Sequence, residues 1–337
     1  MVAAWSPHRA SPGCVRRRIH RRRSAQSIAI SVASRLIVKN TVRAWAMQPN
    51  LSWPFDYVDV LAGVLPFSRS AAAVEPVSLK HCAAEWICAP GISARRAILY
   101  LHGGAFLTCG LNTHRSLAIR LSAAADARVL NIGYRKLPSH QLSDAIDDGL
   151  SGLRWLHDRG FDGDQVVVAG DSAGGYLAFM TTLAALGSHI DKPAGVATVS
   201  PFTDTDPTRK LGQRNVRGCS MFTGRALSMF VQYLGEARLG DCPSSVASPA
   251  DADLSAMPPV TIHASSDELL LADAELMAKR LNATGIRCDL HLWNGQIHDF
   301  PLAADVLPEG RRAIRYIGDF VKEVTDAPHR HLAPTAG

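Results

Sequence analysis

The segment most informative about the fold is Gly170-Asp171-Ser172-Ala173-Gly174. It follows the apolar run Val166–Ala169 and opens a helical pattern over Ala173–Leu186. A Gly-x-Ser-x-Gly sequence between a strand and a helix predicts a sharp, strained turn that lifts the serine hydroxyl above a sheet. The helix N-terminus beneath it favours developing negative charge. A glycine-rich turn that holds a phosphate or only packs is the alternative.

Short apolar runs alternate with longer helical patterns on both sides of this turn. This alternation predicts an α/β fold built on a mostly parallel sheet. The expected strands are Leu79–Ala89, Ala97–Leu101, Val129–Tyr134, Val166–Ala169, Val196–Val199, Val260–Ala264 and Cys288–Trp293. The expected helices lie around residues 113–125, 143–159, 173–186, 270–283 and 309–324.

The stretch 204–246 interrupts this rhythm and is interpreted as an insertion after the strand at Val196–Val199. It holds five basic residues between Arg209 and Arg225 and one expected helix over Ala226–Leu234. Its basic residues could favour anionic substrates, but a solvated surface is the preferred interpretation.

The composition is that of a globular protein, and the excess of positive charge lies in the N-terminal segment. The 337 residues are 47% hydrophobic and 20% charged, which excludes wholesale disorder and fibrous repeats. The net charge is +6, but ten of the 36 basic residues and no acidic one lie in residues 1–47. The remainder carries 26 basic against 30 acidic residues, so a nucleic-acid-binding surface spread over the fold is not expected.

The seven cysteines are scattered, and none lies at zinc-ligand spacing. We expect small core residues in a reducing compartment rather than a disulfide framework, with a Cys82–Cys88 pair left open. No metal and no organic cofactor is expected.

The N-terminal segment allows several interpretations. Residues 1–24 are expected to form a basic, disordered leader, and Met47 could be an alternative start. An export signal, a transit-type peptide and an amphipathic helix on a membrane surface are the alternatives. The apolar residues of 24–47 are interrupted by Arg35, Lys39 and Arg43, which argues against a membrane span.

Two further motifs lie at the ends of predicted strands. His102-Gly103-Gly104-Ala105 follows Ala97–Leu101, where small residues can direct backbone N–H groups at an oxyanion. His102 itself is expected to organise this loop rather than to act as a base. An ordinary Gly-Gly turn is the alternative.

An acid and a histidine come later in the chain, each after a strand. Asp267 follows Val260–Ala264, and His298 follows Cys288–Trp293. The order Ser172, Asp267, His298 is that of α/β-hydrolases, and all three would lie at the carboxyl ends of strands. Glu268 is the alternative acid, with Asp267 preferred. Asp273 is expected on a helix surface, and His291 is expected to be packed rather than catalytic.

Six blocks in this order resemble the hormone-sensitive-lipase-like family of α/β-hydrolases, in particular its bacterial esterases. The resemblance implies an α/β-hydrolase fold with a mostly parallel eight-stranded sheet, an N-terminal helical cap over residues 25–75, and a hydrolase domain over 76–325. Residues 326–337 are expected to be a flexible tail. The blocks are His102–Ala105, Tyr134–Ser139, Gly170–Gly174, Ser200–Asp204, Asp267–Leu269 and His298–Phe300.

The family implies a serine carboxylesterase or lipase-like hydrolase acting on short- to medium-chain esters. Its oxyanion hole maps to the N–H groups of Gly104, Ala105 and Ala173, with Gly103 shaping the turn. Ala105 replaces the family's third glycine and is strained if its φ is positive. Departures from the family pattern also occur at Lys136, Ser139 and Tyr176, and an aspartate, Asp299, stands in the His-Gly-Phe block.

The sequence leaves the activity and the partners partly open. An amidase or deacetylase on N-acyl substrates and a non-catalytic binding protein are the alternatives to an esterase. The expected partner is a small-molecule ester, with peripheral membrane contact through the basic N-terminus and a homodimer left open. The cysteine pattern favours the cytoplasm, whereas the arginine-rich leader favours membrane association or export.

Overall fold

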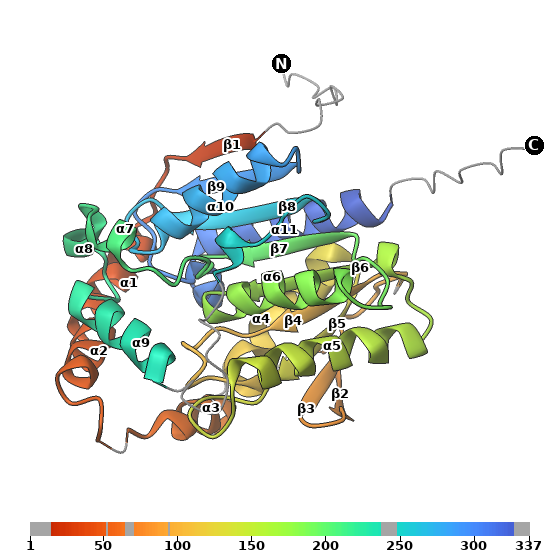
Figure 1. The fold of residues 1–337 in the computed structure, drawn as a ribbon, viewed down its shortest axis with the longest axis horizontal. Coiled ribbons are helices and arrows are strands. Elements are labelled where there is room, and N and C mark those ends of the chain that lie inside the picture. Colours follow the sequence, from red (N-terminus) through yellow and green to blue (C-terminus); the bar gives the residue numbers. More distant parts are fainter. Residues whose placement is uncertain (1–14, 52, 65–70, 94, 237–247, 327–337) are drawn as a thin grey trace, which may run out of the picture.

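The computed structural model describes residues 15–51, 53–64, 71–93, 95–236 and 248–326. Its centre is one nine-stranded sheet with the order β1-β9-β8-β7-β6-β4-β5-β3-β2 (Figure 1). Only β3 runs against the other strands. The strands are β1 (Val15–His20), β2 (Ala73–Ser78), β3 (Ala83–Cys88), β4 (Ala97–Leu101), β5 (Arg128–Gly133), β6 (Val166–Asp171), β7 (Gly195–Val199), β8 (Val260–Ser265) and β9 (Cys288–Trp293).

Helices cover both faces of the sheet, which makes its central strands apolar on both sides. One face packs on α4 (Leu111–Ala125) and α11 (Pro308–Thr325). The other packs on α5 (Leu142–Asp158), α6 (Ala173–Leu186) and α10 (Leu271–Ala283). In β4, Leu99 and Leu101 belong to the second core, whereas Ile98 and Tyr100 belong to the first. The mostly parallel α/β architecture predicted from the apolar runs is confirmed.

The ninth strand corrects two expectations, an eight-stranded sheet and a disordered leader over residues 1–24. Residues 15–20 form β1, which pairs in parallel with β9 at the edge of the sheet. Ion pairs join Arg16 to Asp289 and Arg17 to Glu275, and the ring of His20 stacks on Trp293 at a centroid distance of 3.7 Å. An edge strand is held by main-chain hydrogen bonds and needs no apolar pattern, so a composition-based reading misses it. Residues 1–14 lie outside the described part.

Three helices fill most of the segment predicted as a cap: α1 (Ala25–Leu36), α2 (Val38–Met47) and α3 (Phe55–Val64). The insertion contributes the short helices α7 (Thr208–Leu211) and α8 (Asn215–Gly218), followed by α9 (Gly224–Glu236). Helix α2 packs on α9, and together they lie beyond the carboxyl ends of the central strands (Figure 1). Residues 237–247 and most of the predicted tail, 327–337, lie outside the described part.

The insertion is tied to helix α10 by a buried ion pair that corrects the expectation for Asp273. Asp273 is 1% exposed rather than on a surface, and it lies 2.9 Å from the buried ammonium of Lys210. The same carboxylate accepts hydrogen bonds from the N–H groups of Thr203 and Asp204. A lysine and an aspartate can be buried at this site because they pair with each other.

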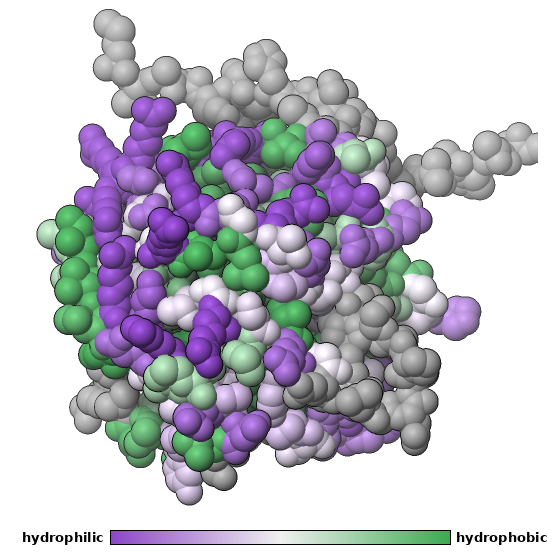
Figure 2. Space-filling view, turned by 60° about the vertical axis from the view of Figure 1, so that its left-hand side comes forward, coloured by the Kyte–Doolittle hydropathy of each residue, from purple (hydrophilic) through white to green (hydrophobic). Residues whose placement is uncertain are grey.

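The side of the molecule that carries α1 and α2 mixes strongly hydrophobic and strongly hydrophilic surface (Figure 2). Large apolar side chains of α1 and of the α1–α2 junction are exposed there. Within the described ranges, no helix has both the length and the apolar character that crossing a membrane requires.

Candidate active site

Ser172 lies on the sharp turn between β6 and α6, in the conformation that the motif predicts. Its φ of 52° and ψ of −116° are strained for a residue with a side chain. A Cβ on Gly174 would lie 1.9 Å from the carbonyl oxygen of Leu101, and a Cβ on Gly170 would lie 2.3 Å from that of Gly174. The two glycines therefore allow the close backbone approach that holds the turn.

A line of hydrogen bonds connects three buried side chains at the carboxyl ends of strands. The hydroxyl of Ser172 lies 2.9 Å from Nε2 of His298. Nδ1 of the same ring lies 2.5 Å from Oε2 of Glu268. A serine, an imidazole and a carboxylate in this order form the geometry in which the imidazole can take the serine proton while the acid orients the ring.

The acid in this line is Glu268, and the preference for Asp267 is wrong. The Asp267 side chain accepts a hydrogen bond from the hydroxyl of Ser266 at 2.7 Å and is partly exposed. Glu268 is 1% exposed and carries its carboxylate to the histidine. Both acids follow the same strand, and their order in the chain does not reveal which one the loop turns inward.

The carboxylate of Glu268 is fixed by two donors at the carboxyl ends of β7 and β8. Its Oε1 accepts from the hydroxyl of Ser200 at 2.9 Å and from the N–H of Ser265 at 2.7 Å. The side-chain amide of Asn215, in α8, donates to the backbone carbonyls of Ser266 and Glu268. The insertion thus holds the acid loop, a role of Asn215 that no sequence signal indicated.

The Gly-Gly turn lies beside the serine, as predicted. Gly103, Gly104 and Ala105 line the same cavity as Ser172. The N–H of Gly103 donates to Oδ1 of Asp171 at 3.0 Å, so this residue shapes the loop. Ala105 has a φ of 55°, which makes it the strained alanine anticipated for a positive φ. Ala173 begins α6, where the first N–H groups have no acceptor within the helix.

His102 and Asp171 form the buried support of this loop. Nδ1 of His102 lies 2.6 Å from the Gly103 carbonyl, and the ring stacks on Tyr134. Burial lowers the pKa of His102 to about 3, so the ring is neutral. Asp171 also accepts from the hydroxyl of Tyr100 at 2.7 Å, and its other oxygen lies 3.2 Å from Nε2 of His114. His102 therefore organises the loop, as the sequence suggests.

Asp299 adds a second carboxylate to the histidine. It is buried, has a φ of 52°, and its Oδ2 lies 3.0 Å from Nε2 of His298. Burial by itself lowers the pKa of His298, but the charges and hydrogen bonds of Asp299 and Glu268 outweigh it and raise the pKa well above its usual value. Burial raises the pKa of Asp299, and the charge of Asp171 adds to that effect. The aspartate in place of the family's glycine was the signal for this feature.

The cavity above Ser172 has a volume of about 550 Å³ and is lined mainly by apolar side chains. Helix α2 contributes Val42 and Trp45, and α9 contributes Phe230. Phe222, from the insertion, packs edge-on against the ring of His298. The cavity can therefore hold an apolar chain whose reacting carbon lies at the serine.

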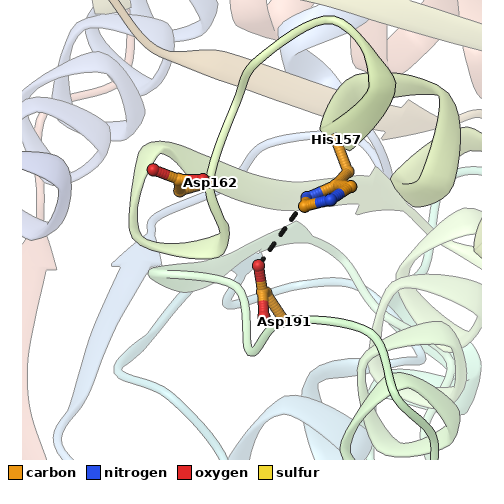
Figure 3. Close-up of side chains that lie close together, drawn as sticks. All are labelled: His157, Asp162 and Asp191. Atoms are coloured by element: carbon orange, nitrogen blue, oxygen red, sulfur yellow. Dashed lines mark ion pairs between the residues drawn. The ribbon is translucent and has the colours of Figure 1, made fainter.

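The remaining groups considered for metal binding, disulfide formation or catalysis are not part of this site. His157, Asp162 and Asp191 come together on the surface (Figure 3), but all three are exposed, and Asp162 precedes β6 at the end opposite Ser172. Exposed groups of this kind are common without an ion, and no metal site is assigned to them. Cys82 and Cys88, whose pairing was left open, are both free thiols. His291 is packed beside His20, as expected.

Comparison with known proteins places this chain in a family. A family model described as the alpha/beta hydrolase fold matches residues 98–302. Esterase LipU of Mycobacterium tuberculosis is 37% identical over 299 residues, which cover 86% of this chain and 100% of LipU. The chain belongs to the α/β-hydrolase family, among its hormone-sensitive-lipase-like bacterial esterases. This esterase is a carboxylic ester hydrolase.

Further relatives resemble the esterase over most of its length. Carboxylesterase/phospholipase LipF of M. tuberculosis is 34% identical, with 88% of this chain and 81% of LipF covered. A crystal structure of EstE5 soaked with p-nitrophenyl butyrate matches with a TM-score of 0.79 and 32% identity, covering 90% of this chain and 100% of EstE5. An esterase from the bacterial hormone-sensitive lipase family matches with a TM-score of 0.78 and 28% identity, covering 90% and 99%.

Proposed function

We propose that this esterase cleaves short- to medium-chain carboxylic esters through a triad of Ser172, His298 and Glu268. The observation that carries the proposal is the unbroken line of hydrogen bonds from the serine hydroxyl to the glutamate, at 2.9 and 2.5 Å. Ser172 attacks the ester carbonyl, and His298 takes its proton and returns it to the leaving alcohol. Glu268 orients the imidazole and stabilises its charged form. Water, activated by the same histidine, then hydrolyses the acyl-enzyme.

The oxyanion of the tetrahedral intermediate is assigned to the N–H groups of Gly104, Ala105 and Ala173. These groups border the cavity beside Ser172, and the N-terminal end of α6 adds a favourable dipole. Donors fixed before the reaction stabilise the charge that develops in the transition state, and each is worth roughly 10²–10³ in rate. The strain at Ala105 is consistent with a loop held in one conformation.

The acyl chain is assigned to the apolar cavity. Its volume and its aromatic walls at Trp45, Phe202 and Phe230 favour a chain of limited length over a long fatty acid. An amide bond could in principle be attacked by the same groups, so esters and amides with one acyl group are to be compared directly.

The proposal is tested by hydrolysis of p-nitrophenyl esters from acetate to palmitate. We expect the rate to peak at short to medium chains and to fall by about 10⁶-fold in Ser172→Ala. Ser188→Ala, beyond the end of α6, is the matched control and should keep full activity. Turnover of the matching anilides above that of the esters would favour the amidase alternative. Folded protein without activity on either class would favour the non-catalytic binding protein.

A further inference from the structure

Helix α1 has the reverse of the pattern expected for a surface helix. Its buried residues are Ser27, Ser31 and Ser34, whereas Ile28, Val32 and Leu36 are 51, 52 and 67% exposed. The three apolar residues are spaced by four, so they form one stripe along the outward side of the helix. A helix that packs in water buries such a stripe. We call these three residues the outer stripe of α1.

The buried serines are held by specific partners, so the helix cannot simply rotate to hide its apolar side. The hydroxyl of Ser27 donates to the carbonyl of Gly295, and that of Ser34 donates to the carbonyl of Ser220. The guanidinium of Arg23 donates to the hydroxyl of Ser31 at 2.9 Å. Turning α1 over would leave these buried polar groups without partners and would cost more than exposing the stripe.

The outer stripe continues to the mouth of the active-site cavity. Ile37, at the α1–α2 junction, is 67% exposed, and Val38 next to it is 37% exposed. Val38 and Leu302, which is also 37% exposed, line the cavity that contains Ser172. The exposed apolar surface and the cavity wall therefore share residues.

The chain segment that carries this surface holds charges of one sign. Residues 15–47 contain no aspartate or glutamate, and the exposed residues Arg21, Arg22, Arg35 and Arg43 flank or belong to the two helices. Figure 2 shows hydrophobic surface directly beside strongly hydrophilic surface on this side. Basic residues next to exposed apolar ones are the combination that binds the headgroups and the outer acyl region of an anionic bilayer.

We propose that the outer stripe of α1 and the α1–α2 junction dock on an anionic lipid surface, with the mouth of the cavity facing the lipid. Esters dissolved in the bilayer would then enter the cavity without crossing water. A second copy of the chain is a poorer occupant, because a two-fold interface would bring the same basic residues face to face. This inference concerns binding and does not depend on the catalytic assignment.

The test is flotation of the full chain, carrying Ser172→Ala to prevent turnover, with vesicles. Vesicles of phosphatidylcholine alone are compared with vesicles that also contain phosphatidylglycerol. We expect binding to the anionic vesicles that weakens as salt is raised. The variant Ile28→Ser/Val32→Ser/Leu36→Ser should bind the anionic vesicles at least about tenfold more weakly. When Ser172 is left unchanged, the same triple variant should hydrolyse soluble p-nitrophenyl butyrate at the wild-type rate.

Two charge variants distinguish docking through this surface from a general attraction of the positively charged protein to anionic vesicles. Arg21→Gln/Arg22→Gln/Arg43→Gln removes three exposed charges that precede α1 or lie in α2. Arg154→Gln/Arg159→Gln/Lys192→Gln removes three exposed charges at the far end of the sheet. Both variants have the same net charge, and only the first should lose vesicle binding. Equal losses, no binding to anionic vesicles at low salt, or a dimer that the stripe variant dissociates would each overturn the proposal.

Discussion

Oδ2 of Asp299 lies 3.0 Å from Nε2 of His298, the same ring nitrogen that lies 2.9 Å from the hydroxyl of Ser172. When the ring is neutral, Nε2 has one lone pair and accepts from the serine. When the ring is protonated, Nε2–H donates to the nearby carboxylate. Asp299 thus stabilises the charged imidazole, which arises transiently in the proposed reaction but cannot take the serine proton in the free enzyme.

This relationship predicts a shift in the pH profile. The carboxylates of Asp299 and Glu268 raise the pKa of His298, so the free enzyme gains activity only as pH rises through a high value. Asp299→Asn removes one charge and keeps a residue that tolerates positive φ. We expect the acid limb of kcat/KM to move to lower pH by about one unit. An unmoved limb would show that Asp299 does not face the ring in the free enzyme.

The identity of the acid is tested by two neighbouring substitutions. Glu268→Gln places an amide opposite Nδ1 of His298 and removes the charge that stabilises the imidazolium, so kcat should fall by roughly 10³–10⁴-fold. Asp267→Asn is the matched control and should change kcat by no more than a few-fold, because Asp267 contacts Ser266 instead. Rates of p-nitrophenyl butyrate hydrolysis by both proteins decide the matter. A larger loss in Asp267→Asn would restore the assignment made from sequence.

The glycines of the serine turn should be intolerant of a methyl group. A Cβ at Gly174 would lie 1.9 Å from the Leu101 carbonyl oxygen, and neither backbone can give way without moving β4 or α6. Gly174→Ala is expected to lower the free energy of unfolding by about 1–3 kcal/mol or more. Gly187→Ala, whose Cβ would meet its nearest atom at 3.7 Å, should unfold like the wild type. Urea unfolding of both variants, followed by circular dichroism, measures the difference.

Three buried histidines on β1, β8 and β9 should make the free energy of unfolding depend on pH. Burial lowers the pKa of His20 to about 4 and that of His291 to about 3, with nearby cations and histidines adding to the effect. His263, also buried, is lowered well below its usual value. The unfolded chain binds protons from about pH 6.5 downward, whereas the folded chain does so only at lower pH. Stability is therefore complete above about pH 6.5 and falls as pH decreases towards 4.

Each of these histidines contributes up to about 1.4 kcal/mol per pH unit in that range. His20→Phe keeps an aromatic ring against Trp293 and removes one titrating group. The free energy of unfolding should then change less between pH 7 and pH 5 than in the wild type. The same slope in both proteins would mean that His20 is not the group that titrates.

The local pattern of the sequence was sufficient for the central strands of the sheet, the serine turn and the histidine that lies beside the serine. Continuous apolar runs indicate strands buried on two faces, and the predicted strands at Ala97–Leu101 and Cys288–Trp293 have those bounds in the structure. Gly170, Ser172 and Gly174 specify the turn because only small residues permit its backbone contacts. Each of these signals depends on residues close in the chain, which is why sequence alone reveals them.

Tertiary structure decided the features that depend on partners distant in the chain. Glu268 rather than Asp267 points inward because Ser200, Ser265 and Asn215 hold its loop. Strand β1 forms because β9, which lies far away in the chain, offers an edge with which it can pair. Ser27 and Ser34 of α1 are buried because carbonyl groups more than 180 residues away accept their hydrogen bonds. Such choices follow from the geometry of the assembled fold, which no local sequence pattern contains.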